Sequence, residues 1–141
     1  MSIKELLFSF QGRIGRKTFW LWNVTYYALI IGFATVANKI FPNIAYLILP
    51  VFLLIVLIPD LAITAKRWHD RNKSVWWLVL NVPLVLGRMT MPIGNADVAA
   101  QAGMMEALVS LVALVCGVWI LVECGFMKGS PGSNAYGPEA E

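Results

Sequence analysis

Four apolar runs follow one another along the chain, and short polar stretches separate them. They predict membrane spans at about residues 19–40, 44–65, 75–93 and 107–127. The uncharged stretch 19–37 alone approaches the roughly 20 residues that a helix needs to cross a bilayer core. The pattern therefore predicts an all-α fold, a polytopic bundle of four transmembrane segments in a single integral-membrane domain over residues 1–141.

A shorter amphipathic pattern precedes the first run. Ile3, Leu6, Leu7 and Phe10 recur at helical spacing and place one apolar stripe on residues 2–11. The segment is too short and too polar to span a membrane, so it predicts an interfacial helix lying on the surface.

Two of the four runs admit an alternative. Residues 19–37 could be the core of a cleaved signal peptide, but this run is longer than the typical 7–15 residues of such a core, which favours an uncleaved span. The third run is short, carries Pro83 in its middle and reaches 93 only by including Arg88. A tilted span is favoured, and a re-entrant half-helix, tolerated where protein buries it, stays open.

The second run and the tail carry helix-breaking residues. Pro50 and Pro59 lie inside the second run and predict kinks, because each proline removes a backbone donor. Residues 128–141 are rich in glycine and proline and predict a flexible tail.

The composition agrees with a membrane protein. Of the 141 residues, 59% are hydrophobic and 13% are charged, against roughly 25% in an average soluble domain. The net charge of +3 includes no long basic block, so no nucleic-acid partner is expected. Cys116 and Cys124 lie about 12 Å apart along one helix, too far for a disulfide, and are expected to be free.

The basic residues divide unequally between the two faces that four spans create. Nine of the eleven lysines and arginines fall in the N-terminal segment, the loop 66–73 and the tail, whereas Lys39 and Arg88 fall on the other face. The positive-inside rule then places the N-terminus and the loop 66–73 in the cytoplasm. The side of the tail depends on whether the third run crosses the membrane.

Three stretches carry a family resemblance. They are GRIGRKTFW at residues 12–20, AKRWHDRNKSVWW at 65–77 and KGSPGSNAYGP at 128–138. In this order they resemble the domain of unknown function 805 family of small bacterial inner-membrane proteins. The resemblance implies a bacterial inner-membrane location and brings no established activity, substrate or cofactor. The chain departs from the family pattern at Lys66 and Trp68, where many members carry arginine and leucine, and by an extra stretch around residues 88–108.

Two carboxylates close to the ends of apolar runs are the first candidates for a site. Asp60 and Glu123 are expected just inside the cytoplasmic interface, in a salt-bridged network that fixes the spans. The arginines expected in this network are Arg13, Arg16 and Arg67. A proton or ion relay through the two carboxylates is the alternative.

The pair His69–Asp70 invites a catalytic interpretation, in which the aspartate orients the imidazole. Neighbouring residues rarely face each other, and Ser74 is better placed to cap the following helix than to act as a nucleophile. We expect Asp70 to accept backbone or arginine hydrogen bonds and His69 to lie at the headgroup level. Sensing of pH by this histidine stays open.

Tryptophans accompany the basic residues of the cytoplasmic face. Trp20, Trp68, Trp76 and Trp77 are expected to anchor the spans at the interface, and the basic residues are expected to bind anionic lipid headgroups. No metal, cofactor or catalytic residue is proposed. The sequence thus favours a non-enzymatic protein that binds lipids, a second copy or another membrane protein, and the alternative is a small transporter or channel component using Asp60 and Glu123.

Overall fold

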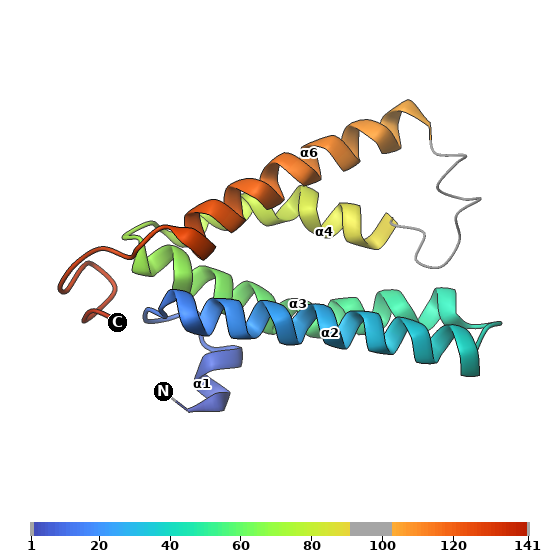
Figure 1. The fold of residues 1–141 in the computed structure, drawn as a ribbon, viewed down its shortest axis with the longest axis horizontal. Helices are drawn as coiled ribbons and strands as arrows, with labels where there is room; N and C mark the ends of the chain where they lie inside the picture. The colour runs from blue at the N-terminus through green and yellow to red at the C-terminus, as the bar shows by residue number, and fades with distance from the viewer. Residues whose placement is uncertain (1, 91–102, 141) are drawn as a thin grey trace.

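The computed structural model describes residues 2–90 and 103–140, apart from the side chains of residues 88–90. Within these ranges the regular structure is helical (Figure 1), and one isolated β-bridge joins Asn134 to Gly137. The elements are α1 (Ile3–Phe8), α2 (Arg16–Ile40), α3 (Ala45–Asp70), the 3₁₀ helix η1 (Val75–Leu80), α4 (Asn81–Thr90), α6 (Met104–Ile120) and the π-helix η2 (Leu121–Phe126). The all-α prediction is confirmed for the described residues.

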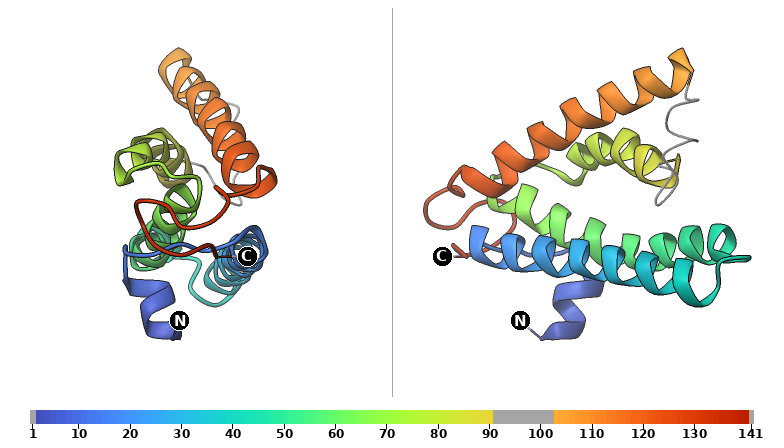
Figure 2. Two further views of the ribbon diagram at one scale, coloured as in Figure 1. Left: turned by 90° about the vertical axis from the view of Figure 1, so that its left-hand side faces the viewer. Right: turned by 45° about the vertical axis from the view of Figure 1, so that its right-hand side comes forward.

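The helices form two antiparallel pairs. α2 packs on α3, and α4 packs on α6. The pairs meet where η2 contacts α2 and α3, at the end of the molecule where both chain termini lie, and they diverge toward the opposite end (Figures 1 and 2). We call these the terminal end and the far end. The short helix α1 projects from the terminal end, across the direction of α2 and α3.

Three described helices are long and apolar enough to cross a membrane. They span Arg16–Ile40, Ala45–Asp70 and Met104–Phe126, and they correspond to the first, second and fourth predicted spans. α3 is one continuous helix that contains Pro50 and Pro59, and the kinks expected at these prolines stay a prediction. The chain is therefore a helical protein with three candidate spans.

The third predicted span differs from the expectation of one helix over 75–93. The 3₁₀ helix η1 is followed by the ten-residue helix α4, and residues 91–93 lie outside the described residues. Pro83 sits in the first turn of α4, where the backbone N–H groups lack intrahelical partners and proline is tolerated. The proline thus explains why the α-helix begins at Asn81 rather than at the start of the apolar run.

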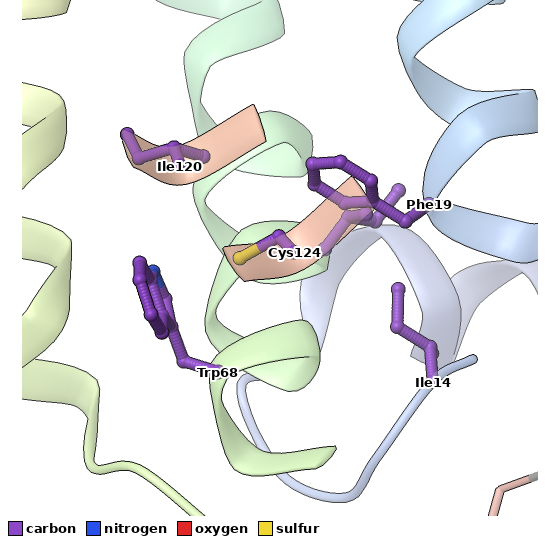
Figure 3. Packing of buried hydrophobic residues seen from close by; sticks show 6 residues of the cluster. Ile14, Phe19, Trp68, Ile120 and Cys124 are labelled. Atoms are coloured by element: carbon purple, nitrogen blue, oxygen red, sulfur yellow. The ribbon is translucent and has the colours of Figure 1, made fainter. Parts of the chain in front are cut away.

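The core lies at the terminal end rather than halfway along the bundle. Ile14, Phe19 and Trp68 pack there with Ile120 and Cys124, so that residues before α2, in α2, in α3 and at the end of α6 meet in one cluster (Figure 3). Every residue of α3 from 62 to 70 is buried. This last stretch of α3 is the centre around which the other elements assemble.

Candidate functional site

The carboxylate of Asp70 lies between two arginines. Arg13 donates from Nε and Nη2 to Oδ1, at 2.9 and 2.8 Å, and Arg67 donates from Nη1 to Oδ2. All three side chains are at most 5% exposed. A buried carboxylate is costly unless it is paired and hydrogen-bonded, and two guanidinium groups meet that need here. The prediction of arginine donors for Asp70 is confirmed.

Arg13 also binds the C-terminal tail. Its Nη1 donates to the carbonyls of Gly132 and Gly137, at 2.7 and 3.2 Å, and its Nη2 donates to the carbonyl of Ser130 at 2.7 Å. The planar fork of a guanidinium suits such simultaneous contacts better than an ammonium group does. One side chain thus joins the segment before α2, the end of α3 and the tail.

The tail approaches Asp70 through its backbone. Ser130 donates to the carbonyl of Asp70 from its backbone nitrogen at 2.7 Å and from its hydroxyl at 3.1 Å. A Cβ atom on Gly129 would lie 2.0 Å from Oδ2 of Asp70. Only glycine permits this approach, so the first glycine after Lys128 is a packing requirement. The composition predicted a flexible tail, whereas residues 129–137 fold back onto the end of α3.

His69 lies inside the same assembly rather than at the surface. It is 6% exposed, and its Nδ1–H donates to the carbonyl of Gly12 at 3.1 Å, because a carbonyl can only accept. Its ring stacks on Tyr136 at a centroid distance of 4.0 Å, and Asn134 donates to its backbone carbonyl at 2.9 Å. The tail thus covers this histidine, and its expected position at the headgroup level stays a prediction. We call Arg13, Arg67, His69 and Asp70, with tail residues 129–137, the Asp70 cluster.

The C-terminal end of the last long helix is held by side chains from the other elements. Five successive backbone carbonyls, from residue 124 to residue 128, each accept a hydrogen bond from an arginine or a tryptophan. The first three carbonyls belong to the last turn of η2, where helix oxygens lack intrahelical partners and the helix dipole is negative, and the other two follow η2 directly. The donors are Arg67, Trp20, Arg16, Arg67 again and Arg71, in the order of the carbonyls.

Glu123 belongs to a separate, more exposed ion group. It accepts from Arg71 Nη2 at 3.1 Å and from Lys73 Nζ at 3.3 Å, and the three side chains are 18–25% exposed. The Lys73 ammonium also lies 4.4 Å from the centre of the Trp77 ring, a cation–π arrangement. The described partners of Glu123 are thus residues that the sequence analysis did not assign to it.

Asp60 bonds to a residue of α2. It is 3% exposed, and its Oδ1 accepts from Trp22 Nε1 at 3.0 Å. The expected network joined Asp60 and Glu123 to Arg13, Arg16 and Arg67. The structure adds Asp70 to this picture, as the carboxylate that both Arg13 and Arg67 bind.

Lys66 fixes α1 to the bundle. This lysine is fully buried, and its Nζ donates to the carbonyl of Glu5 at 2.8 Å and to that of Leu6. These carbonyls are among the last of a short helix, so the ammonium satisfies groups that α1 cannot pair itself. The charge pattern predicted Lys66 in the cytoplasmic loop 66–73, whereas this lysine is buried against α1 at the end of α3.

The four tryptophans predicted as interfacial anchors divide into two kinds. Trp76 is 83% exposed and Trp20 is partly exposed, as an anchor requires. Trp68 is fully buried and stacks on Trp77 at 5.3 Å. Trp68 is therefore a core residue, because the η1 segment folds over it.

Gly129, Ser130 and Asn134 were not selected as site residues from the sequence. The signal was present as the glycine-rich stretch 128–138, but a composition cannot show which carbonyl will face an arginine. Within residues 2–90 and 103–140, no three metal-binding side chains lie close enough together to hold an ion. Both cysteines are free, as expected.

Comparison with known proteins identifies the family. Residues 7–138 match the family described as "Protein of unknown function (DUF805)". The chain belongs to this family. It is 33% identical over 143 residues to "Uncharacterized protein YiiR" of Escherichia coli strain K12, in an alignment that covers 100% of the chain and 92% of that relative. The protein with this printed name in Escherichia coli O157:H7 matches to the same extent. No solved structure matches the chain.

The DUF805 resemblance rested on three separate stretches, and the structure brings them together. Arg13 comes from the first stretch, Asp70 from the second and Ser130 from the third, and all three are joined by hydrogen bonds. The most recognisable parts of the sequence are thus the parts that build one buried assembly. Their first physical role is to close the terminal end of the bundle.

Proposed function

We propose that the protein is a multi-pass inner-membrane protein that acts without catalysis, by binding anionic lipid headgroups at its cytoplasmic face. The proposal has three parts, which are the number of crossings, the orientation and the lipid contact. Each is supported by a different observation.

The position of the tail supports four crossings. Ser130 donates to the Asp70 carbonyl at 2.7 Å, so the tail and the end of α3 lie on one face. In this proposal α6 with η2 spans the membrane, because it is long and apolar enough, and η1 with α4 then crosses the membrane as well. Their combined length is about 27 Å by rise per residue, close to the roughly 30 Å of a hydrocarbon core. A re-entrant third segment would separate the tail from Asp70.

The charge distribution supports a cytoplasmic terminal end. Nine of the eleven lysines and arginines lie in segments that meet there or in the tail, as the positive-inside rule requires for the cytoplasmic side. In this orientation α1, which runs across the spans, lies along the membrane surface. Its exposed apolar residues, Ile3 and Phe8, would enter the interface.

Three exposed lysines at the terminal end carry the lipid assignment. Arg13, Arg67 and Lys66 are buried there, whereas Lys4, Lys17 and Lys128 are exposed around them. These three lysines are therefore the cations that can reach a headgroup. Each surface cation near an anionic leaflet is worth about 1 kcal/mol. Exposed Trp76 would accompany these lysines at the interface.

Catalysis and transport have less support. His69 is stacked and bonded to a carbonyl, and Asp70 is paired with two arginines. Asp60 and Glu123 lie in different surroundings, and Glu123 is paired with Arg71 and Lys73. A relay would need these groups to form one continuous path.

The lipid assignment is tested with the triple variant Lys4→Gln, Lys17→Gln, Lys128→Gln, against the control Lys39→Gln at the far end. Binding of cardiolipin and phosphatidylcholine to the purified proteins is measured by native mass spectrometry. The wild type and the control should retain cardiolipin preferentially, and the triple variant should lose most of this preference. Equal preference in the triple variant and the wild type would contradict the proposal.

Orientation is tested separately with Ser133→Cys, because this tail residue is exposed. A membrane-impermeant maleimide should label it only after the inner membrane is permeabilised. Labelling in cells with an intact inner membrane would overturn the four-span arrangement with a cytoplasmic tail.

A further inference from the structure

An apolar groove lies between the two helix pairs. It has a volume of about 840 Å³, within the roughly 300–1,000 Å³ of sites that take small molecules. α2, α3, α4 and α6 all contribute to its walls, and most of the lining side chains are apolar. The groove follows from the fold, because the pairs meet at the terminal end and diverge beyond it (Figure 1).

The groove is elongated, and its rims are exposed. On α2 it extends from Phe19 to Ile31, about 18 Å by helical rise, slightly more than the depth of one bilayer leaflet's hydrocarbon. Val24 on α2 is 66% exposed, and Leu114 and Val118 on α6 are 63% and 51% exposed. An extended hydrocarbon chain could therefore enter sideways from the bilayer, without passing through water.

One wall carries a buried polar atom that lacks a partner. The side chain of Asn81 lines the groove and is 3% exposed, and its Oδ1 has no hydrogen-bond partner among the described residues. Leaving such an acceptor unsatisfied costs about 1–3 kcal/mol. The site is thus incomplete in a specific way: it needs a hydrogen-bond donor.

The neighbouring polar groups restrict the kind of donor. Asp60 and Thr64 line the groove beside the apolar residues, and the Thr64 hydroxyl already donates to the backbone carbonyl of Asp60. An anionic carboxylate head has no hydrogen to donate to the Asn81 acceptor and would have to leave water for an apolar groove. A cationic headgroup would have to leave water for an apolar groove, at a higher cost than an uncharged one. An uncharged hydroxyl group can donate to Asn81, and it costs less to bury than a charged head.

We propose that the groove binds a long-chain lipid whose small, uncharged head donates a hydroxyl hydrogen bond to Asn81, as an acylglycerol does. The hydrocarbon chain lies along α2 and α6, and the hydroxyl lies at the depth of Asn81 and Asp60. This site is distinct from the contact of surface lysines with anionic headgroups, and either can fail without the other.

The test uses three photoreactive diazirine probes with the same chain and different heads. They are a monoacylglycerol, the corresponding fatty acid and its methyl ester, which has no donor. Each is added to the purified full-length protein in nanodiscs, and the labelled residues are mapped by mass spectrometry. The monoacylglycerol should label the groove about three- to tenfold more efficiently than the other two, the ratio expected for one net hydrogen bond.

Two variants assign the binding to named residues. Asn81→Leu should reduce monoacylglycerol labelling about three- to tenfold, to the level of the methyl ester. Ala28→Trp should fill the groove and abolish labelling by all three probes, because Ala28 lines it. Leu29→Trp is the matched control, since the neighbouring residue is exposed but does not line the groove, and labelling should be unchanged.

Equal labelling by the three probes in the wild type would overturn the proposal and leave only bulk acyl chains in the groove. This comparison needs no variant, so it stands even where a substitution impairs folding. Labelling that persists in Ala28→Trp would show that the probes bind outside the groove, and it would overturn the proposed position of the lipid. Preferential labelling by the fatty acid would overturn the assignment of an uncharged hydroxyl.

Discussion

The Asp70 cluster and the groove of this helical bundle treat polar groups differently. At the terminal end, Asp70, Arg13 and Arg67 are buried together, and the tail covers them. Along the groove, apolar side chains line an open space, and buried Asn81 leaves an acceptor without a described partner. The first region pairs its ionised side chains internally, although Nε1 of buried Trp68 also lacks a described partner, and the second leaves the acceptor of Asn81 beside an open groove.

The difference shows where the charges of a small membrane protein act. The arginines of the terminal end bind a carboxylate and helix-end carbonyls, so they bring segments together rather than facing a ligand. The groove contributes little to cohesion, since its helices diverge there. A region built for stability and a region available for binding should therefore respond differently to substitution.

The largest effect is expected for Arg67→Ala at the terminal end. The substitution leaves Asp70 with one arginine and removes the donors to the carbonyls of Cys124 and Met127. Breaking a buried ion pair in this way should lower the free energy of unfolding by about 3–5 kcal/mol. The measurement is reversible unfolding in detergent. The control is Lys39→Ala at an exposed site, expected within about 0.5 kcal/mol of the wild type. Similar stabilities of the two variants would contradict the account of this region.

A smaller loss is expected for Gly129→Ala. Its Cβ would clash with the Asp70 carboxylate at 2.0 Å, so the tail must move away and lose its bonds to Asp70. We expect about 1–3 kcal/mol of destabilisation and faster proteolysis of the tail. Gly32→Ala is the control, because a Cβ there meets no atom within 4 Å and alanine favours a helix. A tail equally protected in both variants would argue against the docked arrangement.

In the groove, a substitution is expected to leave the stability unchanged or to raise it. Asn81→Leu replaces a buried acceptor without a described partner by an apolar group of similar size. Stability in lipid-free detergent should stay within about 1 kcal/mol of the wild type or rise, because the cost of the unsatisfied oxygen disappears. Thermal unfolding of this variant beside Arg67→Ala tests the contrast between the two regions directly. A loss as large as that of Arg67→Ala would show that Asn81 is structural.

The smallest expected effect is a pH dependence of the stability of α1. Ser2 donates from its backbone nitrogen to the Glu5 carboxylate at 3.0 Å, and the Ser2 hydroxyl accepts from the Glu5 amide at 3.2 Å. The bond from the Ser2 backbone nitrogen to the carboxylate is the main reason why the pKa of Glu5 lies below its ordinary value. The bond to the ionised carboxylate therefore stabilises α1 fully above the pKa of an unfolded glutamate, about pH 4–5. This stabilisation is lost as the pH falls through the lowered pKa.

Hydrogen exchange of α1, corrected for intrinsic rates, measures this effect. Protection should decrease between pH 6 and pH 3 in the wild type and should be nearly independent of pH in Glu5→Gln. The same decrease in both proteins would exclude Glu5 as its cause.

The helices could be predicted from the sequence because the bilayer demands long apolar runs. The three candidate spans and the amphipathic stripe of Ile3, Leu6 and Leu7 came from spacing alone. The division of the third run into η1 and α4 depends on Pro83 and on packing over Trp68, which hydropathy does not register.

The site was predicted less completely. The sequence predicted backbone or arginine donors for Asp70, but it assigned Arg13 and Arg67, the arginines that bind Asp70, to Asp60 and Glu123. Sequence could not show that backbone carbonyls would compete for the same arginines, because every residue carries a carbonyl and only the fold decides which ones face inward. For that reason Glu123 was expected beside Arg67 but lies beside Arg71 and Lys73.

The central claim is that the tail docks on the end of α3, which places both on one face of the membrane. Ala135 donates from its backbone to the Asn72 side chain at 3.4 Å, and both residues are exposed. In a background with Cys116→Ala and Cys124→Ala, the pair Asn72→Cys/Ala135→Cys is treated with a short bis-maleimide in native membranes. Efficient intramolecular cross-linking is predicted, well above that of the control pair Lys39→Cys/Ala135→Cys. Cross-linking no greater than in the control would contradict the docked tail and the four-span arrangement that depends on it.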